Sequence, residues 1–253
     1  MNTGQPAYVP AIELRNIVKD YGVTRALKDV NLAVYRGEVF GYIGANGAGK
    51  TTTIKIMTGL VRPTWGDAMI CGHSITADSL RAKSKIGYVP ESGALFEKLS
   101  AREYLTSMAR LYGVAEPLIC DRIAAWLDYF ALSERLDRPI GALSKGNKQK
   151  VCWASALLHD PEVLILDEPL NGLDVEAISK VKELMAGLGS RGKTIFYSSH
   201  LIDIVEKLCT RIGVLHGGAL IGVGTPTEIR EYFGAESLEQ ALLRFWEGQR
   251  EIA

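Results

Sequence analysis

The stretch Gly44-Ala45-Asn46-Gly47-Ala48-Gly49-Lys50-Thr51 decides the fold of this 253-residue chain. It fits the pattern G-x-x-x-x-G-K-[ST], whose glycines let the backbone curl until its N–H groups point at a phosphate. A strand-like run over 38–43 precedes it, and helical spacing over 51–60 follows it. Lys50 can reach the β- and γ-phosphates, and the Thr51 hydroxyl can bind Mg²⁺. The expected nucleotide contacts are Gly44, Asn46, Gly47, Ala48, Gly49, Lys50, Thr51 and Thr52.

Two carboxylates end a second apolar run. Val163-Leu164-Ile165-Leu166 leads directly into Asp167 and Glu168, and a buried parallel strand delivers its C-terminal residues to the ligand crevice. We expect Asp167 to hold Mg²⁺, directly or through water, and Glu168 to accept a proton from an attacking water. His200 follows another strand-like run, 194–199. A lone histidine is usually structural, but beside a nucleotide it can hydrogen-bond a γ-phosphate.

Periodicity divides the chain into parts. Strand-like runs and turns fill the first part. Helical spacing takes over from about residue 95, with helices expected over 102–112 and 117–130, and strands and helices alternate again after about residue 155. The tail places Leu238, Leu242 and Phe245 on one helical face. We therefore expect an α/β core that holds an inserted helical subdomain. The expected boundaries are 1–94 and 156–230 for the two parts of the core, 95–155 for the insert and 231–253 for the tail.

Composition excludes several classes of protein. Lys and Arg number 29, as do Asp and Glu, so the formal net charge is zero and we expect no nucleic-acid partner. No apolar run approaches the ~18 residues needed to span a bilayer. The start, MNTGQPAYVP, lacks the basic-then-apolar pattern of a secretion signal. The four cysteines are scattered, with no C-x-x-C pair, as in a reduced cytoplasmic protein.

Residues Leu143-Ser144-Lys145-Gly146-Asn147-Lys148-Gln149-Lys150 identify the class of phosphate-binding protein. They resemble the signature motif of ABC-type ATPases, whose common form reads L-S-G-G-Q. Tyr21 resembles the aromatic residue that stacks on adenine in that family, Asn171-Gly172-Leu173-Asp174 the loop after the catalytic glutamate, and His200 the switch histidine. Six motifs stand in the family's order over about residues 10–225.

The resemblance implies a P-loop NTPase fold of ABC type, with a mixed sheet core, a small antiparallel β part and an inserted helical subdomain. It also implies that two such domains form a head-to-tail sandwich with ATP in each interface, and that the helical insert transmits motion to a membrane permease. One domain would supply Lys50, Thr51, Glu91, Asp167, Glu168 and His200. The second ATPase subunit would supply Ser144 and Gly146, so hydrolysis would require a dimer.

Two departures from the common pattern bear on mechanism. Lys145 and Asn147 replace Gly and Gln of the signature, while Ser144 and Gly146 are kept. Glu91 stands where the family usually has Gln. Its carboxylate can ligate Mg²⁺ through oxygen, but it cannot donate as an amide does.

Both departures resemble those of bacterial exporter-type ABC ATPases that pair with separate permeases. We therefore expect a cytoplasmic subunit held on the inner face of the membrane by its permease. The loop 92–99 follows Glu91, and Gly93 permits backbone movement there, while Leu95 and Phe96 either face a coupling helix of the permease or belong to the core. The tail 236–243 is similar to the closing segment of this subgroup and either packs on its own core or contacts the dimer partner.

Two other classes of protein share parts of this pattern. A non-transport ABC ATPase of DNA repair carries a long coiled coil between the motifs at Lys50 and Asp167, and one of translation carries two ATPase halves in one chain; this sequence has neither feature. A GTPase needs N-K-x-D to read guanine, whereas Asn147-Lys148-Gln149-Lys150 ends in lysine. The same P-loop occurs in small-molecule kinases. A nucleotide competition assay would test the alternative of a GTPase or a small-molecule kinase.

Overall fold

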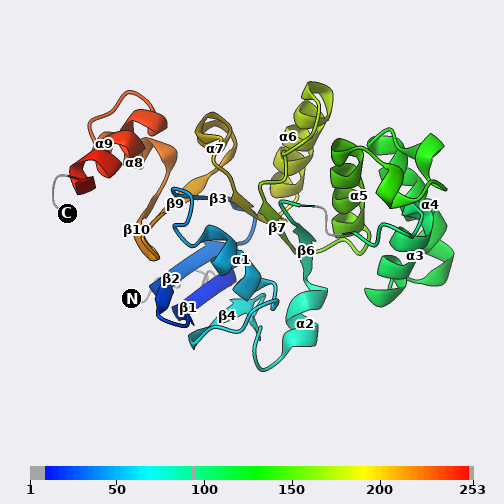
Figure 1. The fold of residues 1–253 in the computed structure, drawn as a ribbon, viewed down its shortest axis with the longest axis horizontal. Coiled ribbons are helices and arrows are strands. Elements are labelled where there is room, and N and C mark those ends of the chain that lie inside the picture. Colours follow the sequence, from blue (N-terminus) through cyan, green and yellow to red (C-terminus); the bar gives the residue numbers. More distant parts are fainter. Residues whose placement is uncertain (1–8, 93–94, 251–253) are drawn as a thin grey trace, which may run out of the picture.

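The computed structural model describes residues 9–92 and 95–250, with side chains up to residue 244. Figure 1 shows a large sheet in the middle of the molecule, a smaller sheet beside it, and helices gathered at both ends. This is the mixed α/β arrangement that the sequence predicted. Gly93, expected to permit movement in the loop 92–99, lies outside the described residues, as does most of the stretch MNTGQPAYVP.

The large sheet has six strands in the order β10-β9-β3-β8-β7-β6. Five of them run parallel, and β10 pairs antiparallel with β9 at one edge. Every residue of β3, β7 and β8 is buried, as expected for parallel strands that are covered on both faces. The strands span Val39–Ile43 (β3), Ile86–Val89 (β6), Val163–Asp167 (β7), Thr194–Ser198 (β8), Arg211–His216 (β9) and Ala219–Gly224 (β10).

The small sheet is antiparallel, in the order β2-β1-β4-β5. Its long hairpin closes where Tyr21 pairs with Thr24, and the turn contains Gly22 at φ +58°, a left-handed conformation that favours glycine. The hairpin places Tyr21 at one tip of the sheet. The strands span Pro10–Tyr21 (β1), Thr24–Tyr35 (β2), Trp65–Ile70 (β4) and His73–Ser74 (β5).

Helix α1 lies between the two sheets and contacts β2, β4 and β7. It ends at Met57, three residues earlier than the predicted 51–60, because Gly59 at φ +66° leaves the helical conformation. Helices α3, α4 and α5 contact one another and form the group at the right of Figure 1. The helices span Lys50–Met57 (α1), Ser79–Ser84 (α2), Ala101–Leu111 (α3), Glu116–Tyr129 (α4), Lys145–Leu157 (α5), Val175–Ser190 (α6), Ile202–Leu208 (α7), Pro226–Tyr232 (α8) and Leu238–Arg250 (α9), with single 3₁₀ turns at Ser133–Arg135 and Ile140–Ala142.

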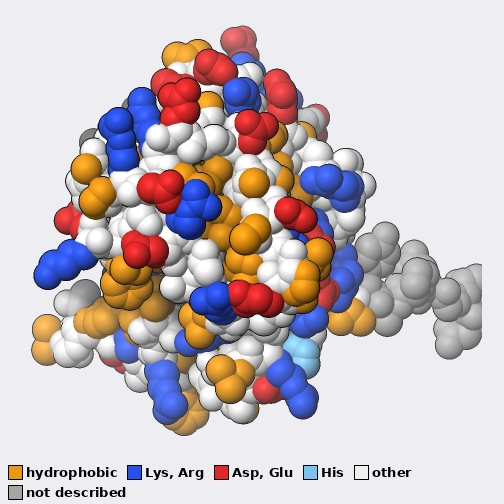
Figure 2. Space-filling model, turned by 90° about the vertical axis from the view of Figure 1, so that its right-hand side faces the viewer, with side chains coloured by type: hydrophobic (Ala, Val, Ile, Leu, Met, Phe, Trp, Pro, Cys, Tyr) orange, Lys and Arg blue, Asp and Glu red, His pale blue; other side chains and the backbone are white. Residues whose placement is uncertain are grey.

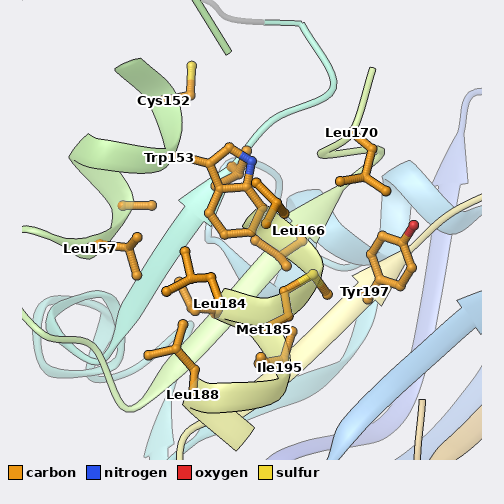
Figure 3. Close-up of a cluster of buried hydrophobic side chains, with 14 of the residues drawn as sticks. Cys152, Trp153, Leu157, Leu166, Leu170, Leu184, Met185, Leu188, Ile195 and Tyr197 are labelled. Atoms are coloured by element: carbon orange, nitrogen blue, oxygen red, sulfur yellow. The ribbon is translucent and has the colours of Figure 1, made fainter. Parts of the chain in front are cut away.

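Two hydrophobic cores cover opposite faces of the large sheet. On β8 the side chains alternate, so that Phe196 joins the core shared with the small sheet while Ile195 and Tyr197 join the core under α5 and α6. Figure 3 shows part of this second core, where Trp153 of α5 lies over Leu166 of β7. The end of β7 is therefore held from one side by α5, the helix that begins within the stretch resembling the signature.

The tail helix α9 packs within the chain. Leu238 and Leu242 are buried members of the second core, and α9 contacts α7 and α8. These two side chains therefore pack on their own core, one of the two alternatives weighed for the tail. The side chain of Phe245 lies outside the described part of the chain. Across residues 9–92 and 95–250, no helix combines the length and the apolar character needed to cross a bilayer.

Candidate functional site

The phosphate-binding loop joins β3 to α1 and is packed too tightly for side chains at two of its glycines. A Cβ on Gly44 would lie 2.3 Å from the carbonyl oxygen of Leu215 in β9. Gly49 has φ +111°, and its Cβ would lie 2.7 Å from the Leu27 side chain and 2.9 Å from the Ala26 carbonyl oxygen. The loop is thus wedged between β9 and β2, which fixes the path of its backbone N–H groups.

Lys50 is the first residue of α1 and turns back over the loop. Its Nζ donates to the carbonyl oxygens of Gly44 at 2.7 Å and Ala45 at 3.2 Å. Burial lowers the pKa of Lys50, and the nearby Glu168 and Asp167 carboxylates oppose that shift. The ammonium group is held by neutral acceptors that phosphate oxygens can replace.

Asp167 ends β7 as a buried carboxylate. Burial raises the pKa of Asp167 above its usual value, and the charge of Glu91 raises it further. Glu91, two residues beyond the end of β6, lines the same cleft. Several negative groups thus meet at the edge of the sheet where β6 and β7 end, which makes that edge suited to a cation.

Glu168 adopts a left-handed backbone conformation, with φ +46°, and its N–H donates to the carbonyl oxygen of Ser198 at 3.0 Å. Its Oε2 lies 2.9 Å from Nδ1 of His200 and accepts from the Ser199 hydroxyl at 3.3 Å. The Glu168 side chain is 11% exposed, whereas that of His200 is 56% exposed. The end of β8 therefore holds one oxygen of Glu168 and leaves the histidine open to a ligand.

These groups line one cleft of about 420 Å³. It brings together ten of the predicted site residues: Asn46, Gly47, Gly49, Lys50, Thr51, Thr52, Glu91, Asp167, Glu168 and His200. Among the described residues, Gly44, Ala48 and Tyr21 do not line it. Ala26 does, although the sequence did not predict it, because only tertiary packing brings β2 against Gly49.

The two signature residues lie apart from this cleft. Ser144 is the N-cap of α5, and its hydroxyl accepts from the N–H of Asn147 at 3.3 Å. A Cβ on Gly146 would lie 2.5 Å from the carbonyl oxygen of Gly172, so the signature loop packs directly on the loop after Glu168. Neither Ser144 nor Gly146 contributes to the cleft of its own chain.

Tyr21, the residue expected to stack on adenine, ends β1 with 47% of its surface exposed. The ammonium group of Lys19 lies 4.9 Å from the centroid of its ring and donates to the carbonyl oxygen of Arg62 at 2.9 Å. Lys19 of the same strand thus contacts the ring and is itself bonded to the segment after α1. Its role toward adenine stays a prediction.

Comparison with known proteins agrees with this geometry. A family model described as ABC transporter matches residues 27–171. The linearmycin resistance ATP-binding protein LnrL of Bacillus subtilis is 37% identical over 229 residues, which cover 90% of this chain and 74% of that protein. The Nod factor export ATP-binding protein I of Cupriavidus pinatubonensis is 36% identical over 224 residues, 88% of this chain and 69% of that protein.

Solved structures give the same result. The structure of an ATP-binding subunit of an ABC transporter matches with a TM-score of 0.87 and 35% identity, covering 92% of this chain and 98% of that one. A dimeric ATP-binding cassette in a post-hydrolysis state, bound to ADP and Pi, matches with a TM-score of 0.77 and 27% identity over 85% of this chain and 98% of that one. The predicted fold class is thereby confirmed, and the chain belongs to the ABC transporter family, as an ATP-binding domain that hydrolyses ATP.

Proposed function

We propose that this chain is the ATPase subunit of an exporter, and that it drives a separate membrane permease through ATP-dependent dimerisation. The observation that carries the proposal is the cleft in which the phosphate-binding loop meets Asp167, Glu168 and His200. Relatives named for Nod factor export and linearmycin resistance support the direction of transport. The alternative, a non-transport ATPase of DNA repair or translation, is not favoured, because the matching family is that of ABC transporters.

Hydrolysis would begin with Lys50 exchanging the carbonyl oxygens of Gly44 and Ala45 for phosphate oxygens. Glu168 would then act as the general base. His200 and Ser199 occupy its Oε2, which leaves Oε1 to accept a proton from the attacking water. To donate from Nδ1 to Glu168 and from Nε2 to the γ-phosphate at the same time, the exposed ring of His200 would carry a proton on both nitrogens.

Mg²⁺ fits the donor groups at this edge of the sheet. The ion prefers oxygen ligands and usually takes one or two from the protein, with substrate phosphates and water completing its shell. Thr51 and Asp167 both line the cleft and offer a hydroxyl and a carboxylate, and Glu91 offers a further carboxylate. When bound, the ion would neutralise charge that develops on the phosphates.

A second ATPase subunit would complete the site, as a copy of this chain or a related one. Ser144 and Gly146 lie outside the cleft of their own chain, at the start of a 13-residue helix whose first N–H groups have no intrahelical partner. In a head-to-tail dimer, these donors would cap the γ-phosphate held by the other chain.

The permease would dock in a groove of about 400 Å³ between α3, α5 and the segment after β6. Its lining is mostly apolar and comprises Leu60, Tyr88, Pro90, Ser92, Leu95, Tyr104, Met108, Tyr112, Cys152, Ser155 and Ala156. Leu95, expected either to face the permease or to belong to the core, lines this groove, and Phe96 is exposed beside it. Figure 2 shows the molecule from the side of α3–α5, where hydrophobic side chains reach the surface between charged ones. A cytoplasmic coupling helix of the permease suits this surface and would hold the chain at the inner face of the membrane.

The test is to purify the chain with the membrane protein that accompanies it and to reconstitute both in vesicles. With the ATPase subunits outside, an exporter accumulates its substrate inside the vesicles when ATP is added. Substrate leaving the vesicles instead would show import and refute the export direction. ATP hydrolysis that is unaffected by the membrane protein would refute the coupling.

A further inference from the structure

Gln149 lies on the inner face of α5, two residues after Asn147 in the stretch that resembles the signature. The residue is 2% exposed. The Nε2 atom donates to two carbonyl oxygens, those of Pro90 and Pro169, each at 3.3 Å. Because both partners only accept, the nitrogen of the amide must face them, and each of its two hydrogens has one carbonyl.

The two carbonyls flank two residues of the proposed site. Pro90 immediately precedes Glu91, and Pro169 immediately follows Glu168. The ladder between β6 and β7 ends with the pair Val89 and Leu166. Beyond that pair, the amide of Gln149 joins the two segments that the strands no longer hold together.

Trp153 strengthens one end of this bridge. It lies four residues after Gln149 on the same helix and is fully buried, and its Nε1 donates to the carbonyl oxygen of Pro169 at 3.2 Å. Figure 3 shows its indole ring over Leu166, in the cluster to which Leu170 also belongs. The carbonyl of Pro169 therefore accepts from two side chains of α5, while Gln149 alone of these two reaches Pro90.

We propose that Gln149 is a positioning residue that sets the spacing between Glu91 and Glu168. The inference rests on the proposed function, in which Glu168 is the base and Glu91 a ligand of Mg²⁺. The bridge also ties both carboxylates to the helix that begins at Ser144. A displacement of α5 by nucleotide on the partner chain would reach the chain's own cleft through this amide.

The central variant is Gln149→Leu, which keeps the approximate volume and removes both hydrogen bonds. We expect the ATPase kcat of the full-length protein to fall by about 10- to 100-fold, since displacing a catalytic group by about 1 Å costs up to ~10²-fold. The affinity for ATP should change by less than about threefold, because Lys50 and the phosphate-binding loop are untouched. If the leucine variant folds poorly, Gln149→Met replaces it in the test, because the methionine side chain is unbranched and has nearly the same length as that of glutamine.

Two controls on the same helix separate positioning from stability. Val151→Ala leaves a cavity in the core to which Trp153 also belongs and should lower the melting temperature at an unchanged kcat. Trp153→Phe removes one donor to Pro169 but keeps the bridge, so its kcat should lie clearly above that of Gln149→Leu.

Each result decides for or against the bridge. If Gln149→Leu and Gln149→Met lower only the melting temperature, as Val151→Ala does, Gln149 is a structural residue and the inference is overturned. Equal losses of kcat in Trp153→Phe and Gln149→Leu would overturn it too, because the bridge to Pro90 would then add nothing. Glu168→Gln, measured alongside, tests the proposed function separately. If that variant hydrolyses ATP at the full rate, Glu168 is not the general base, whatever the Gln149 variants show.

Discussion

Replacing Glu168 by Gln is the sharpest perturbation of the cleft, because it removes a base and almost nothing else. The amide keeps an acceptor oxygen in the place of Oε2, which lies 2.9 Å from His200 Nδ1 and 3.3 Å from the Ser199 hydroxyl. Both contacts can persist, so the free energy of unfolding should change by about 1 kcal/mol or less, the usual worth of a single hydrogen bond.

The effect on turnover should be far larger. A positioned general base contributes about 10²- to 10⁴-fold, which at 1.36 kcal/mol per tenfold corresponds to about 3–5 kcal/mol of transition-state stabilisation. Binding of ATP should survive, because Lys50, Thr51 and Asp167 remain and one negative charge beside the phosphates is removed. The dimer with ATP bound should therefore accumulate.

The measurements are ATPase rate, ATP affinity and dimer fraction at saturating ATP. Glu162→Gln is the matched control: Glu162 lies just before β7, at the opposite end of the strand from Glu168, and forms ion pairs with Arg36 at 2.8 Å and Lys85 at 2.7 Å. This variant changes the same functional group outside the cleft, and its kcat should stay within about twofold. A Glu168→Gln protein that hydrolyses ATP at a near-normal rate would refute the assignment of the base.

Three further outcomes are expected. Since Ser144 and Gly146 would act on nucleotide held by another chain, the specific ATPase activity should rise with protein concentration. Full activity in a dilute sample that light scattering shows to be monomeric would contradict this. Glu91→Gln should be nearly silent in partner-stimulated turnover because oxygen ligation persists, whereas Glu91→Ala should reduce it more than it reduces ATP affinity in a binding titration. Lys85 and Arg36 lower the pKa of Glu162 from 4.5 to about 2. The stability that this carboxylate adds is therefore present above pH 4.5 and is lost as the pH falls toward 2. In thermal melts, the difference in melting temperature between wild type and Glu162→Gln should shrink over that range.

The sequence predicted those parts of the site whose chemistry is local. The phosphate-binding loop, the strand that ends in Asp167 and Glu168, and the strand before His200 are contiguous motifs, and each lies where its pattern indicates. The helices expected over 102–112 and 117–130 begin and end within one residue of the observed α3 and α4. The apolar spacing that marks such helices can be recognised in the sequence without knowledge of any tertiary contact.

Contacts between distant segments could not be predicted in this way. Ala26 lines the cleft because the loop at Gly49 is pressed against β2, and no local pattern in β2 marks that approach. The early end of α1 is a different case, since Gly59 at φ +66° is a local stop signal, although the apolar periodicity continues to Leu60.

Helix α5 combines two surfaces that constrain its sequence differently. Its exposed start carries Ser144 and Lys145, where a substitution changes what the helix offers to another chain. Its buried side carries Gln149 and Trp153, whose donors end on backbone carbonyls of the same chain. A buried carbonyl that loses its donor costs about 1–3 kcal/mol, so the donors of Gln149 and Trp153 also contribute to stability. Lys145, by contrast, replaces the family's common glycine at an exposed position. Of the two departures from the common signature, Lys145 therefore lies at the exposed start of the helix, whereas Asn147 is buried.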